Sequence, residues 1–217
     1  ELPPRLAQPL GVRKPSLVHR LALVMVWLAV ASGAVVFSEP APTDVLMLGS
    51  IVLLPVIGLV TFRTPTLLLG AVLLVICGLG FISALHAGNT AKATTHMAIS
   101  LYLSLAANVI AGFDNKDQIR HSRIIFRAHL AGALIAAIAA LIGYFDLVDG
   151  AKELFTKFDR ASGPFKDPNV FGPFLVPAMV YALHVWFNRS FLKGLPAAAA
   201  LGILSLAVLL SFSRGAW

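Results

Sequence analysis

The chain contains few charged side chains and a single cysteine. Asp, Glu, Lys and Arg make up 12% of its 217 residues, about half the share typical of soluble domains. So few charges cannot coat a water-soluble particle, and one cysteine cannot form a disulfide scaffold. The remaining composition is 58% hydrophobic with a mean hydropathy of +0.85, which excludes a disordered chain. The composition therefore predicts an integral membrane protein in contact with the lipid bilayer.

Acidic residues are fewer than basic residues in this chain. The chain has ten acidic and 17 basic residues, which gives a net charge of +7. Such a charge can indicate nucleic acid binding, but here the basic residues separate apolar runs and form no continuous face. We therefore exclude nucleic acid as a partner. His, Cys, Asp and Glu form no cluster at metal-ligand spacing, so the sequence predicts no metal and no other cofactor.

Seven long apolar runs fill most of the chain. They cover residues 21–38, 45–62, 66–85, 95–113, 128–145, 170–188 and 194–212. A helix needs about 20 largely apolar residues to cross a bilayer. The sequence therefore predicts an all-α polytopic bundle of about seven transmembrane helices. We expect residues 1–20 to form a cytoplasmic segment and residues 21–145 to form five helices. Residues 146–169 are then expected to form a loop, and residues 170–217 two further helices.

The distribution of Lys and Arg between the loops predicts the orientation of the bundle. With the N-terminus inside, the inner segments hold 11 basic residues and the outer segments hold six. The inner residues are Arg5, Arg13, Lys14, Arg20, Arg63, Lys116, Arg120, Arg123, Arg127, Arg189 and Lys193, and the outer ones are Lys92, Lys152, Lys157, Arg160, Lys166 and Arg214. This arrangement places the 146–169 loop at the outer face.

Two features inside the runs concern packing. Ala128, Gly132, Ala136 and Ala140 recur at a spacing of four, which predicts a small-residue face that lets two helices approach closely. Asn108 is a polar residue within the fourth run. Its amide predicts either a hydrogen bond between helices or a substrate contact.

The outer loop 146–169 carries most of the remaining chemistry. Leu154, Phe155 and Phe158 recur at helical spacing among charged residues, so the segment 150–160 predicts a short amphipathic helix on the membrane surface. Asp167 and Pro168 then form a favourable N-cap and first-turn pair. One interpretation is simply a helix start. The other is a phosphate site at free N–H groups, with charge from Lys166 and Arg160 and with Asp167 orienting Asn169 or a neighbouring basic group.

Arg214 lies at the predicted outer end of the last helix. Two interpretations are open: a cation that stabilises the C-terminal end of a helix, or a guanidinium that recognises phosphate.

Two outer segments together resemble the O-antigen ligase family, which includes related polymerases of O-antigen and exopolysaccharide. The matching residues are Ser162, Gly163, Phe165, Asp167, Pro168, Asn169, Phe171 and Gly172, followed by Ser213, Arg214, Gly215 and Ala216. The resemblance covers residues 162–216. Family members are about twice as long and carry a large periplasmic loop with essential Arg and His residues, so the chain is expected to correspond to an N-terminal part.

The resemblance implies a glycosyltransferase of the bacterial inner membrane. Such enzymes transfer a glycan from undecaprenyl diphosphate, at the periplasmic face, to lipid A–core or to a growing polysaccharide. By that resemblance Arg214 contacts the lipid diphosphate, while the turn around Asp167 and Asn169 shapes the donor site. It assigns no catalytic base. The alternatives are a transporter or lipid-carrier flippase, favoured by proline-broken helices, and an inert truncated fragment.

Overall fold

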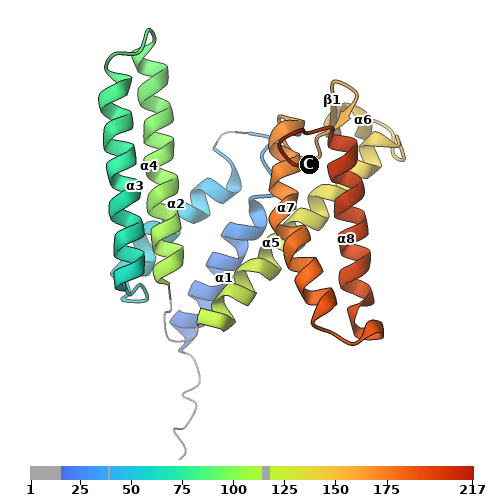
Figure 1. Ribbon diagram of the computed structural model, residues 1–217, viewed down its shortest axis with the longest axis horizontal. Helices are drawn as coiled ribbons and strands as arrows, with labels where there is room; N and C mark the ends of the chain where they lie inside the picture. Colours follow the sequence, from blue (N-terminus) through green and yellow to red (C-terminus); the bar gives the residue numbers. More distant parts are fainter. Residues whose placement is uncertain (1–15, 39, 114–117) are drawn as a thin grey trace, which may run out of the picture.

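The computed structural model describes residues 16–38, 40–113 and 118–217, and these residues are predominantly helical (Figure 1). Eight helices and two short strands occur in the order α1 (Leu17–Ser32), α2 (Pro42–Val56), α3 (Thr64–Ala84), α4 (Thr90–Gly112), α5 (Gln118–Tyr144), α6 (Ala151–Phe155), β1 (Thr156–Lys157), β2 (Arg160–Ala161), α7 (Pro168–Phe187) and α8 (Phe191–Ser211). The predicted all-α class is therefore confirmed.

Five of these helices are long and apolar enough to cross a membrane: α3, α4, α5, α7 and α8. Each corresponds to one predicted run, although α5 begins ten residues before its run. Large apolar side chains along α3 are exposed, as expected for a surface in contact with lipid. These features indicate a multi-pass membrane protein.

The first two predicted runs form helices shorter than expected. α1 has 16 residues and α2 has 15, so they extend about 24 Å and 22 Å at 1.5 Å per residue. A helix needs roughly 30 Å to cross the hydrocarbon core. Both runs continue as extended backbone, and the predicted count of seven spanning helices is therefore not confirmed.

A C-terminal cap ends α2 inside its apolar run. Gly58 has a positive φ of 71°. Its N–H donates to Pro55 O, and the N–H of Leu59 donates to Leu54 O, which is the hydrogen-bond pattern of a Schellman motif. Hydrophobicity correctly predicted a helix in this run but not the residue at which the helix ends.

The extended segments after α1 and α2 have hydrogen-bond partners in the rest of the chain. The N–H of Val36 donates to Pro164 O, and the N–H of Thr61 donates to Gly112 O, both at 2.9 Å. Pairing of this kind lets non-helical backbone stay buried in protein. The first pair also links the segment after α1 to the loop that precedes α7.

The helices α1, α5, α7 and α8 pack together. The helices α3 and α4 form an antiparallel pair that contacts the others mainly through α2 (Figure 1). The predicted small-residue face of α5 lies within this packing. Ala128, Ala136 and Ala140 are fully buried, and a Cβ on Gly132 would lie 2.5 Å from Ala31 O of α1. The prediction of a packing face is confirmed.

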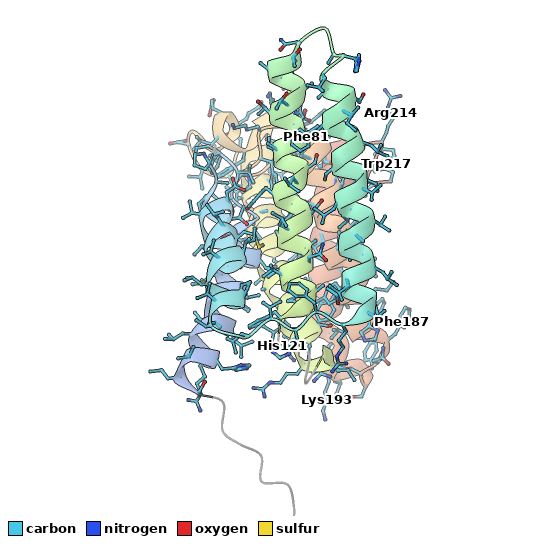
Figure 2. All side chains as sticks on the ribbon, turned by 90° about the vertical axis from the view of Figure 1, so that its left-hand side faces the viewer. Phe81, His121, Phe187, Lys193, Arg214 and Trp217 are labelled. Atoms are coloured by element: carbon cyan, nitrogen blue, oxygen red, sulfur yellow. The ribbon has the colours of Figure 1, made fainter. Side chains whose placement is uncertain are left out.

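The loops alternate between two ends of the molecule (Figure 1). One end contains α6, β1, β2, the start of α7 and residues 212–217, and we call it the hairpin end. The opposite end contains the start of α5 and the α7–α8 connection, and we call it the basic end. Arg214 lies toward the hairpin end, and Lys193 lies at the basic end (Figure 2).

Candidate functional site

The hairpin end begins with a helix shorter than predicted. α6 stops at Phe155, and residues 156–161 form an antiparallel pair with Lys157 opposite Arg160. The prediction of a helix over 150–160 is therefore confirmed for 151–155 and wrong for 156–160. Phe158 and Asp159 both have positive φ, 55° and 53°, which is typical of the two-residue turn that reverses a tight hairpin. This turn directs the chain back so that Arg160 faces the end of α8.

Arg160 joins three segments of the hairpin end. Its Nε donates to Ser211 O at 2.7 Å, and its Nη2 donates to Phe212 O and to Asn169 Oδ1, both at 2.9 Å. The two carbonyls belong to the C-terminal end of α8, where backbone acceptors lack helical partners. Arg160 thus provides the cation at a helix end that was one interpretation of Arg214.

Asp167 caps α7 as predicted. Its Oδ1 accepts from the N–H of Asn169 at 2.7 Å, and its backbone oxygen accepts from the N–H groups of Val170 and Phe171. Pro168 has no N–H to offer. The hypothesis of free N–H groups at this helix start is therefore wrong, and an anion here has to be held by side chains.

Gly172 brings the two sequence segments into contact. A Cβ at this position would lie 2.7 Å from Ser213 Cβ, 2.9 Å from Ser211 Oγ and 3.0 Å from Ala216 Cβ. Only the absence of a side chain lets the C-terminal residues pack this closely on α7. The elements that the sequence motifs mark, about 40 residues apart, are therefore one structural unit.

The loop before α7 is buried beneath this unit. Gly163 has φ of 54°, and a Cβ on it would lie 2.8 Å from Ala136 O of α5. The ring of Phe165 packs against Phe171 and Phe174, with centroids 5.7 Å and 5.0 Å apart. These contacts explain the glycine and the phenylalanines of the motif as packing residues.

The charged residues of the motif differ in what they contact. Arg160, Asp167 and Asn169 are joined by hydrogen bonds, whereas Lys166 is exposed and its carbonyl accepts from Lys157 Nζ at 2.7 Å. Arg214 is exposed and makes no hydrogen bond to a described residue. Its guanidinium is therefore available to an anionic ligand.

Sequence reasoning named two further residues of this end, Lys157 and Ser213, but assigned neither a role in the site. Lys157, like Lys152 of α6, is a further exposed cation at the hairpin end. Ser213 is fully buried, and its Oγ has no hydrogen-bond partner among the described residues. The sequence shows that Ser213 directly precedes Arg214, but the burial of the Ser213 hydroxyl depends on contact with Gly172.

Comparison of the chain with family models, curated proteins and solved structures finds no match in any of the three.

Proposed function

We propose that the chain forms the donor-lipid part of an O-antigen ligase-type glycosyltransferase. The enzyme would lie in the bacterial inner membrane and take a glycan from undecaprenyl diphosphate at its periplasmic face. The acceptor would be lipid A–core or a growing polysaccharide. One observation carries the proposal: Arg160 and Gly172 bring the two segments that bear the resemblance together, and Arg214 stays exposed beside them.

The chemistry requires cations beside the leaving group. Breaking the glycosidic bond leaves negative charge on the lipid diphosphate, and fixed cations stabilise such charge in the transition state. Arg214 and Lys166 are exposed at the hairpin end and would contact the diphosphate. Arg160 already donates to two carbonyls and to Asn169, so its role would be to position the site. Asp167 would shape the site through its cap on α7.

The proposal includes the seven-span topology with the N-terminus inside. Extended backbone would continue α1 and α2 to the membrane surface, which is compatible with the hydrogen bonds of Val36 and Thr61 to other segments. The basic end would then face the cytoplasm, in accord with the excess of Lys and Arg in its loops.

Replacing Arg214 with Ala tests the proposal directly. We expect the full-length protein, reconstituted in vesicles with undecaprenyl-diphosphate glycan and acceptor, to lose at least tenfold in transfer rate because a cation at the leaving group is removed. Lys193→Ala, an exposed cation at the basic end, is the matched control and should retain activity. Unchanged transfer by the Arg214→Ala protein would refute the assignment.

A further inference from the structure

A large groove opens between α5 and α7 at the basic end. Its volume is about 1040 Å³, and it is lined by the first half of α5 and the second half of α7. In Figure 1 the two helices cross obliquely and diverge toward this end. The groove lies at the opposite end of these helices from the hairpin end and belongs to no part of the proposed donor site.

The crossing point of the helices defines the inner limit of the groove. His129 Nε2 of α5 lies at hydrogen-bond distance, 3.0 Å, from Phe174 O of α7. Beyond this contact Pro177 removes one backbone hydrogen bond from α7. One turn further, the rings of Phe126 and Tyr181 stack with centroids 5.4 Å apart. These packed rings therefore join the two helices within the groove lining.

The lining changes from apolar to cationic along the groove. Leu130 and Val176 lie near the crossing and Val180 lies further along α7, while Arg127 lies two residues from His129 and Arg123 and Arg189 line the part furthest from the crossing. All three arginines are exposed. Among the described residues, no Asp or Glu lines the groove. An occupant that fits has a negatively charged head and an apolar tail.

If α5 crosses the bilayer, its length places the arginines near a membrane surface. α5 contains 27 residues, and about 20 suffice to cross the hydrocarbon core. Twenty residues counted back from Tyr144 reach position 125, so Arg123 and Arg127 lie on either side of the boundary. Arg189 follows the end of α7, in the connection to α8 at the same end of the molecule. The apolar half of the groove then lies at the depth of acyl chains.

We propose that this groove binds one anionic phospholipid of the adjoining leaflet. Its phosphate would pair with Arg123 and Arg189, and one acyl chain would lie along Leu130 and Val180. Basic pockets between transmembrane helices bind anionic headgroups in this way. The proposal uses the membrane character of the chain and is independent of the proposed transferase.

Lipid binding to the purified full chain tests the proposal. Native mass spectrometry compares dioleoylphosphatidylglycerol with dioleoylphosphatidylcholine, which has the same chains and no net charge. We expect the anionic lipid to bind at least tenfold more tightly. The Arg123→Gln/Arg189→Gln protein should lose about 30-fold of this affinity, because each cation near the surface contributes about 1 kcal/mol and 1.4 kcal/mol corresponds to tenfold.

A second pair of cations provides the matched control. Arg20→Gln/Lys193→Gln removes the same charge from exposed residues outside the groove lining, and it should change affinity less than threefold. An equal loss in both double variants would overturn the proposal, since only general surface charge would then act. Equal binding of the two lipids would overturn it as well.

Filling the groove separates a lipid site from a site for phosphate alone. Val180 is 62% exposed, so Val180→Trp adds bulk along the apolar wall without crowding the core and leaves every charge in place. We expect it to weaken binding of the anionic lipid at least fivefold. Unchanged lipid binding in this variant, with displacement of the lipid by millimolar inorganic phosphate, would overturn the proposal in favour of a phosphate site.

Discussion

Arg160 and Arg214 show how two arginines of one motif region take different roles. Arg160 of β2 is partly buried, and its guanidinium donates to Asn169 of α7 and to the carbonyls of Ser211 and Phe212 at the end of α8. Arg214 is exposed and makes no hydrogen bond to any residue in the described ranges. Their charges are the same, so the difference comes from what the fold places around each side chain.

The role of Arg160 predicts that Lys cannot replace it. A lysine has one compact ammonium group and cannot reproduce the planar fork that reaches Ser211 O, Phe212 O and Asn169 at once. We expect Arg160→Lys to lower the free energy of unfolding by about 1–3 kcal/mol, the cost of leaving partly buried acceptors unpaired. The midpoint of thermal unfolding in detergent, followed by circular dichroism, measures the change.

Arg214→Lys is the matched control for this prediction. Because Arg214 is exposed, the substitution should change stability by less than about 0.5 kcal/mol. Equal shifts in the two lysine variants would contradict the structural role that we assign to Arg160.

At the scale of the elements, glycines determine where helices end and how closely they pack. Gly58 ends α2 within an apolar run, and Gly172 lets the C-terminal residues contact α7. The first effect could be predicted from the sequence, because glycine often follows a helix C-cap. The second could not, since the partner of Gly172 lies about 40 residues further along the chain.

A methyl group at Gly172 is expected to separate α7 from the C-terminal segment. Its Cβ would lie 2.7 Å from Ser213 Cβ, so Gly172→Ala should destabilise the protein by about 1–3 kcal/mol through overpacking. In α8, a Cβ on Gly202 would meet open space. Gly202→Ala should therefore be neutral or stabilising by up to about 1 kcal/mol, as Ala is the better helix former.

Thermal unfolding of the two alanine variants, run in parallel in the same detergent, distinguishes these effects. If Gly172→Ala unfolded at the same temperature as Gly202→Ala, the close contact between Gly172 and Ser213 would not contribute to stability.

The hairpin end contains the element that the sequence analysis predicted least well. Leu154, Phe155 and Phe158 lie at helical spacing among charged residues, and this pattern favours a surface helix. The structure instead ends α6 at Phe155 and turns at Phe158 and Asp159. Neither is glycine, and the Asn-Gly type of signal that marks such turns is missing. Contacts of the neighbouring residues, above all Arg160 with α8, stabilise the hairpin.

At the scale of the whole molecule, the positions of the loops predict which side of the membrane each end faces. Arg214 and Lys193 are exposed at opposite ends of α8. In a background where Cys77 is replaced by Ser, a membrane-impermeant maleimide should label Arg214→Cys in intact cells. It should label Lys193→Cys only after the membrane is opened, because the loops richer in Lys and Arg stay inside.

The same labelling tests whether α1 crosses the membrane. Ser38 and Arg20 are exposed near the two ends of α1. We expect Ser38→Cys to be labelled from outside and Arg20→Cys only from inside. Labelling of both residues from the same side would contradict the seven-span topology, because α1 would then not cross the membrane.

The sequence by itself determined the helical class, the membrane environment and the approximate position of each apolar run. These follow from local properties, because the length and hydrophobicity of a segment decide whether it can satisfy its backbone inside lipid. It also predicted the Asp167 cap, since a cap involves residues that are neighbours in the chain.

Only the tertiary structure decided which residues of the candidate site are structural and which are available to a ligand. Arg160 caps α8 from a distant loop, Gly172 receives Ser213, and α5 and α7 diverge to form a cationic groove. Each of these depends on how helices cross and which side chains meet between them. Such contacts join residues far apart in the chain, so neither spacing nor composition encodes them in a form that can be predicted from one sequence.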